Sequence, residues 1–214
     1  MVPRLADSQR PDRAFQVSFT QNFLEESLQI LKTVDASSIE ACAAGLADVR
    51  QRGGRLFVLG VGGSAGHASH AVNDFRKLCG FEAYAPTDNV SELTARINDD
   101  GWDRVFSDWL DGSRMTELDG LLVFSVGGGD RERGVSGNLV EAMEMARGRR
   151  TSIFAIVGRD GGHAAKVADT VVLIPPLYPE RVTPHTEGLC AVIWHLLVTH
   201  PLLARQSAKW EELK

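Results

Sequence analysis

Four short apolar runs recur along the chain, and segments with helical spacing separate them. The runs are RLFVLG (55–60), GLLVFSV (120–126), TSIFAIVG (151–158) and DTVVLI (169–174). Each run is continuously apolar, as expected of a parallel strand that is covered on both faces. A weaker strand is expected at 82–85. The alternation predicts an α/β fold, a three-layer α/β/α sandwich around a mostly parallel five-stranded sheet.

The segments between these runs predict the helices. They are expected near 64–79, 101–110, 135–147, 161–168 and 184–199. Two further helices precede the first strand: residues 15–34 repeat apolar side chains at helical intervals, and SSIE before the next apolar positions has the pattern of a capping box from Ser37. Residues 1–14 are interpreted as a flexible tail. We therefore expect one domain, 15–214, with its N-terminal helices appended to the sandwich.

Composition and charge exclude several classes of protein. The 214 residues are 43% hydrophobic and 24% charged, which suits one globular domain. The net charge is −5 with scattered basic residues, so no nucleic-acid partner is expected. The chain has no signal-peptide core and no run of about 18 apolar residues, so no membrane contact is expected. Cys42, Cys79 and Cys190 lie far apart, which excludes a zinc ribbon and indicates a reducing, cytoplasmic location.

The glycine-rich stretch GVGGS (60–64) directly follows the first strand. Ligands of open parallel sheets bind beyond the carboxyl ends of the strands. Glycines there let backbone N–H groups approach an oxyanion, and Ser64 adds a hydroxyl at the start of a helix, so a phosphate is the expected ligand. The stretch lacks the third glycine of a dinucleotide fingerprint and the lysine of a P-loop. A tight turn that needs glycine only for its geometry is the alternative interpretation.

A second strand end repeats this pattern and reveals a family resemblance. Ser125 is followed by three glycines, 127–129, and a helix is entered through Ser136-x-Asn138. Together with 60–64, His70 and the Asn98-Asp99-x-Gly101 segment, these residues resemble the phosphoheptose isomerase branch of the SIS (sugar isomerase) domain family over nearly the whole chain. In that family the two loops hold the sugar phosphate. The resemblance implies substrate or phosphate binding by Gly62, Gly63, Ser64, Asn98, Asp99, Ser125, Gly127, Gly128 and Ser136.

The same resemblance implies a metal site. Family members carry a histidine and a glutamate four residues apart after the first glycine loop, and a glutamine and a histidine eight apart on a later helix. The matching residues are His70, Asp74, Glu187 and His195. Helix positions four or eight apart differ by only about 40° or 80°, so each pair can face one point. Two histidines and two carboxylates suit a divalent ion such as zinc. Considered alone, each histidine has another interpretation: His70 as a residue on the surface of its helix, and His195 as a hydrogen-bonded residue of the core.

The sequence also departs from the family pattern. Val61 replaces the usual asparagine of the first loop, and the second loop loses two hydroxyls while gaining an Asp-Arg-Glu-Arg-Gly segment. Backbone N–H groups of the three glycines, or Arg131 or Arg133, could replace those hydroxyls; solvated loop arginines are the alternative. Asp74 is shorter than the family's glutamate, and Glu187 adds a negative charge.

The chemistry that the resemblance implies is aldose–ketose isomerisation. Sedoheptulose 7-phosphate would become D-glycero-D-manno-heptose 7-phosphate through an enediol. Asp74 or Glu187 is expected to act as base, His195 as acid, and the metal to polarise the carbonyl. A non-catalytic sugar-phosphate sensor or partner-binding protein, or an isomerase of another sugar phosphate, stays open.

Three expectations concern the surroundings of this site. Asp88, with Thr87, could bind sugar hydroxyls or could cap a helix that begins near Ser91. His185 could reach the substrate or only start the last long helix. The helix at 15–34 has more apolar positions than one sheet face needs, so we expect a homo-oligomer, a tetramer. The family resemblance implies that residues of a partner subunit complete each active site.

Overall fold

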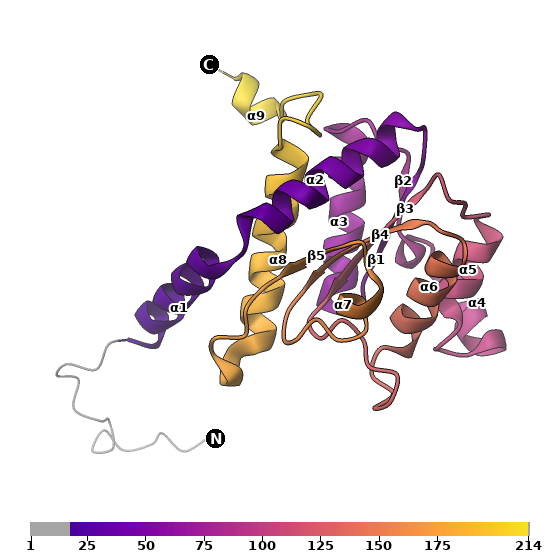
Figure 1. Ribbon diagram of the computed structural model, residues 1–214, viewed down its shortest axis with the longest axis horizontal. Helices are drawn as coiled ribbons and strands as arrows, with labels where there is room; N and C mark the ends of the chain where they lie inside the picture. Colours follow the sequence, from indigo (N-terminus) through magenta and orange to yellow (C-terminus); the bar gives the residue numbers. More distant parts are fainter. Residues whose placement is uncertain (1–17, 214) are drawn as a thin grey trace, which may run out of the picture.

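The computed structural model describes residues 18–213, and a single parallel sheet forms its centre (Figure 1). The strands are β1 (Leu56–Leu59), β2 (Ala83–Tyr84), β3 (Gly120–Ser125), β4 (Ser152–Val157) and β5 (Thr170–Leu173). Their order is β2-β1-β3-β4-β5, and every neighbouring pair is parallel. All residues of β1 and β3 are buried, as the continuous apolar runs require. The five-stranded sheet is therefore confirmed.

Helices cover both faces of this sheet. They are α1 (Phe19–Thr33), α2 (Ala36–Gln51), α3 (Gly63–Lys77), α4 (Val90–Asp100), α5 (Val105–Gly112), α6 (Gly137–Gly148), α7 (Ala164–Val167), α8 (Val182–Thr199) and α9 (Lys209–Glu212). One apolar core lies between the sheet and α2, α3 and α8, and a second core lies between the sheet and α5, α6 and α7. The α/β/α sandwich is confirmed. Helix α1 extends beyond the sandwich and contacts the start of α8 (Figure 1).

Several helix boundaries differ from the prediction. Helix α2 is capped by Asp35, whose carboxylate accepts a hydrogen bond from the backbone N–H of Ser37 at 2.9 Å, so SSIE is not a capping box. The helix expected at 101–110 begins only at 105. The segment before it, 90–100, forms helix α4, which ends at Gly101 because that glycine has φ of +87°. The predicted tail 1–14, and 15–17 of the predicted first helix, lie outside the described residues.

Membrane insertion finds no support in these helices. Within residues 18–213, none of them combines the length and the apolar character that crossing a bilayer requires.

Candidate active site

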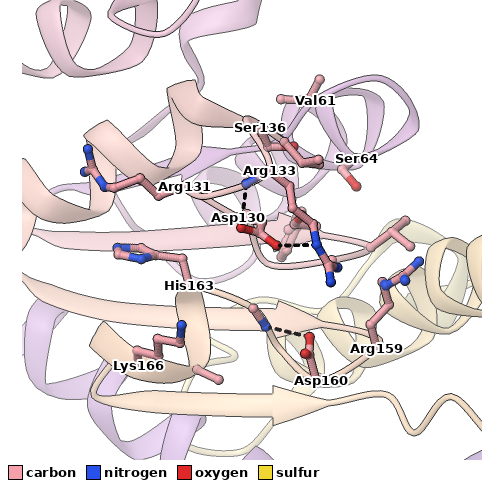
Figure 2. A pocket seen from close by; sticks show the side chains of 18 of the residues that line it. Val61, Ser64, Asp130, Arg131, Arg133, Ser136, Arg159, Asp160, His163 and Lys166 are labelled. Atoms are coloured by element: carbon pink, nitrogen blue, oxygen red, sulfur yellow. Dashed lines mark hydrogen bonds and ion pairs between the residues drawn. The ribbon is translucent and has the colours of Figure 1, made fainter.

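A cleft of about 820 Å³ lies at the carboxyl ends of β1, β3 and β4 (Figure 2). The loops that follow these three strands line it, together with the start of α8. Four of the predicted phosphate-binding residues are in its wall, namely Ser64, Ser125, Gly127 and Ser136. The cleft therefore occupies the edge of the sheet at which ligands of parallel α/β proteins bind.

The loop after β1 turns sharply to place α3 at this cleft. Gly62 has φ of +61°, a backbone conformation that favours glycine. Gly63 lies so close to Glu187 that a Cβ atom at position 63 would come within 2.7 Å of the Glu187 Oε1 atom. The absent side chain thus lets the carboxylate of α8 approach the first glycine loop, and Glu187 also lines the cleft.

The glycine-rich loops after β3 and β4 pack backbone against backbone. A Cβ atom on Gly128 would overlap the carbonyl of Gly161, and one on Gly162 would overlap the carbonyls of Gly127 and Gly129. The backbone N–H of Gly128 donates to the hydroxyl of Ser125 at 3.0 Å. Since this N–H is already bonded, the geometry does not support the expectation that it binds a phosphate.

The extra segment of the second loop forms a small hairpin over the cleft. Asp130 and Val135 exchange two backbone hydrogen bonds of 2.9 Å. The Asp130 carboxylate accepts hydrogen bonds from the N–H groups of Glu132 and Arg133 at 3.0 and 3.1 Å, which fixes the turn. Arg133 therefore lines the cleft from a structured turn.

Three basic side chains in the cleft wall were not anticipated from the sequence. They are Arg159, His163 and Lys166. Arg159 belongs to GRDGG, which follows β4 and is a third glycine-rich strand end. That repeated pattern was the signal that could have identified the loop as part of the site.

Three of the four predicted metal ligands come together on α3 and α8. His70, Asp74 and His195 each offer a ligand atom, and these atoms lie within 4.8 Å of one another. The Asp74 Oδ2 atom is 3.6 Å from His70 Nε2 and 4.0 Å from His195 Nε2. Glu187 is not part of this group, because its carboxylate lies beside Gly63 instead.

Contacts behind the two histidines orient their rings. His195 Nδ1 lies 2.7 Å from the carbonyl oxygen of Ala191, which can only accept, so Nδ1 donates this hydrogen bond and Nε2 is the ring nitrogen that faces Asp74. Trp194 is fully buried. Its ring stacks on the His195 ring with 3.5 Å between the centroids, and it meets the His70 ring edge-on with 4.7 Å between the centroids. Two imidazoles and one carboxylate fit a divalent ion and leave coordination positions open for a substrate.

The remaining predicted substrate residues lie elsewhere. Asp88 is exposed and accepts a hydrogen bond from the Ser69 hydroxyl at 2.6 Å, and Asn89 rather than Asp88 caps α4. Asn98 and Asp99 are exposed at the end of α4, where the Asn98 amide donates to the Asp99 carboxylate at 2.8 Å. The structure does not bring these three side chains to the cleft wall.

His185 is buried in a polar network between α1 and α8, away from the cleft wall. Its Nε2 atom lies 2.9 Å from the Glu26 carboxylate, which also binds the Arg181 guanidinium at 2.6 and 2.7 Å. The hydrogen bond from Arg181, followed by that from His185, lowers the pKa of Glu26 to about 2, against the opposing effect of burial. His185 therefore joins two helices, and its predicted contact with substrate has no geometric support.

The cysteines take no part in the site. Burial raises the pKa of Cys42 and Cys190 to about 12 and that of Cys79 to about 11. All three thiols thus stay protonated near neutral pH, which makes them poor nucleophiles and poor metal ligands.

The fold and the site define a class of protein. The family model described as "SIS domain" matches residues 21–158. The chain belongs to the SIS domain family.

Within that family, the chain is similar to phosphoheptose isomerases. It is 32% identical to phosphoheptose isomerase of Yersinia pestis over 167 residues, covering 75% of this chain and 79% of that protein. It is 31% identical over 211 residues to the lincomycin biosynthesis protein LmbN of Streptomyces lincolnensis, covering 94% of this chain and 71% of that protein. The structure of phosphoheptose isomerase from Neisseria gonorrhoeae superposes with a TM-score of 0.71 at 28% identity, over 84% of this chain and 94% of that one. These similarities confirm the prediction of an isomerase.

Proposed function

We propose that the protein interconverts an aldose and a ketose phosphate along the seam between α3 and α8. The observation that carries this proposal is the position of two polar clusters on these helices. Gly63 lies beside Glu187, and Asp74 lies beside His195, so the helices run side by side in the same direction. His70 is seven residues beyond Gly63, about 10 Å along the helix axis. An extended sugar phosphate held at the cleft can span that distance.

The side chains at the far end of the seam supply the proton transfer. Asp74 Oδ2 lies between two imidazoles and is largely buried, so it is held in place to take the proton that moves between C1 and C2. His195 Nε2 is the atom that would either exchange a proton with the substrate oxygen or bind the ion, one at a time, because Nδ1 is bonded to Ala191. Glu187, in the cleft wall, is the alternative base. A divalent ion, zinc in our proposal, would be held by His70, Asp74 and His195 and would polarise the carbonyl.

The proposed substrate is sedoheptulose 7-phosphate and the product D-glycero-D-manno-heptose 7-phosphate. The similarity to phosphoheptose isomerases supports this choice, and the altered second loop is the reason to test other ketose phosphates as well. We further propose that the enzyme works in the cytoplasm as a homotetramer, with active sites completed between subunits.

The test is incubation with a panel of ketose phosphates, following aldose formation before and after chelation and after zinc is restored. We expect turnover of a seven-carbon ketose phosphate that is lost with the chelator and returns with zinc. The variants D74N and E187Q, compared at equal zinc content, identify the base: the base variant loses at least about 100-fold in kcat, and the other chiefly changes KM. If the protein binds sugar phosphates but converts none of them, it is a sugar-phosphate sensor and not an isomerase.

A further inference from the structure

Arg159 differs from the other arginines of the cleft in having no acidic partner. Arg131 pairs with Glu141 at 2.8 Å, and Arg133 lies 3.6 Å from Asp130. For Arg159, no carboxylate between residues 18 and 213 lies within ion-pair distance. The guanidinium is exposed in the cleft wall, and its Cδ atom packs over Gly127. It is therefore free to bind an anionic ligand.

The backbone of Arg159 is held in a conformation that disfavours a side chain. Its φ is +53°, in the left-handed region, where a glycine would fit without a penalty. Two hydrogen bonds close the turn: Gly161 N–H donates to the Gly158 carbonyl at 3.0 Å, and Gly162 N–H donates to the Asp160 carboxylate at 3.1 Å. Backbone strain of this kind clusters at functional sites, and Arg159 is such a residue in the cleft wall.

Several backbone donors of the neighbouring loops are already in use. The N–H groups of His163 and Ala164, at the start of α7, donate to the carbonyls of Gly129 and Gly128 at 2.8 and 3.0 Å. The N–H of Gly128 is bonded to Ser125, and Asp130 takes the N–H groups at the hairpin tip. The N–H groups of Gly127 and Gly129 in the cleft wall have no partner among the described residues, so an anion here can be bound by them together with cationic side chains and free hydroxyls.

We propose that Arg159 binds the phosphate monoester of the substrate, taking over from the hydroxyls that this loop lacks. Figure 2 shows Arg159 and Arg133 extending toward one another from the loops after β4 and β3. A guanidinium presents a fork of N–H donors that matches two phosphate oxygens. The assignment rests on the proposed function, because it identifies which residue recognises the phosphate of that same substrate.

Calorimetric titration with inorganic phosphate tests the assignment without relying on catalysis. We expect R159Q to bind phosphate about 10- to 100-fold more weakly than the parent, the scale of one charged hydrogen-bonded pair. R159K should lose less, because it keeps the charge but not the fork. The matched control is R150Q: Arg150 is also exposed with φ of +58° but does not line the cleft. Phosphate binding by R150Q should equal that of the parent.

A glycine variant separates binding from folding. R159G accepts the left-handed backbone, so its unfolding temperature should equal or exceed that of the parent while phosphate binding falls. Equal phosphate affinities of R159Q, R159G and the parent would overturn the assignment, even if the enzyme isomerises sugar phosphates with unchanged KM. If phosphate binding depends on Arg159 and no ketose phosphate is converted, the assignment stands and the isomerase proposal fails.

Discussion

At the scale of single residues, His195 is proposed for two roles, metal ligand and proton donor. Its Nδ1 atom is bonded to a backbone carbonyl and its Nε2 atom faces Asp74, so Nε2 is the atom that can serve as metal ligand or as proton donor, and not as both at once. The neighbouring Trp194 stacks on the face of the His195 ring. Loss of the imidazole should therefore affect metal binding or proton transfer.

We expect H195N to lower kcat by at least about 100-fold, because a positioned acid–base group contributes on that scale. The measurement is kcat together with the zinc content of the purified protein by elemental analysis. The control is H200Q: His200 follows the same helix and pairs with Glu40 at 3.1 Å, outside the metal group. A variant H195N that keeps both its zinc and the parent's kcat would show that the histidine is structural.

At the scale of elements, the two interlocked glycine loops determine the shape of the cleft. Gly162 has φ of +52°, and a side chain there would overlap the carbonyls of Gly127 and Gly129. The variant G162A should separate the loops and destabilise the fold by about 1–3 kcal/mol. It should also weaken phosphate binding.

Chemical denaturation and phosphate titration of G162A measure these two effects. Its control is G148A, because a Cβ atom at the end of α6 meets no atom within 4 Å and alanine favours a helix. If G162A is as stable as G148A, the interlocked backbone does not constrain the cleft.

The buried network between α1 and α8 predicts a dependence of stability on pH. The pKa of Glu26 is lowered in the folded state from 4.5 to about 2, so folding is favoured by its ionised form. That stabilisation is complete above about pH 4.5 and is lost as the pH falls toward about 2. Arg181 and His185 are the groups that face this carboxylate.

Thermal unfolding across this range, in the parent and in E26Q, measures the effect. The unfolding temperature of the parent should fall more steeply with acid than that of E26Q, whose amide does not titrate. The variant should also be less stable at neutral pH, since Arg181 loses its charged partner. Parallel curves for the two proteins would exclude Glu26 as the titrating group.

The sequence predicts strands better than it predicts the positions of side chains. Continuous apolar runs predict β1, β3 and β4, which are buried almost throughout, and also the edge strand β5, of which only Val172 is buried. The i, i+4 spacing of His70 and Asp74 likewise places both side chains on one face of α3. Which face of which neighbouring helix lies opposite depends on tertiary packing.

The misplaced residues show this limit. Glu187 and His195 share α8, but eight residues advance about 12 Å along the axis, so Glu187 instead contacts the first glycine loop. Asn98 was placed by its motif alone, and the helix that carries it ends away from the cleft wall. Arg159 was missed because its role depends on the contact between two loops that are far apart in sequence.

At the scale of the whole molecule, exposed apolar side chains lie on the helices that carry the site. On α1, Phe19 is 70% exposed, Leu24 58% and Leu28 55%. On α8, Val192 and Leu196 flank His195 and are 47% and 41% exposed. A second copy that buries Val192 and Leu196 would lie beside the metal group, because both residues are close to His195 on α8.

We therefore expect the parent to be a tetramer, and the double variant L24E/L28E to dissociate into smaller species, because carboxylates cannot be buried unpaired in an apolar interface. Light scattering after size-exclusion chromatography measures the mass. Activity should fall with the loss of assembly, since the partner would close the seam at which His195 acts. The control L118E places the same charge on a leucine that is 49% exposed next to β3, outside α1 and α8, and should leave mass and activity unchanged. A parent that is a fully active monomer at micromolar concentration would show that each subunit completes its own site.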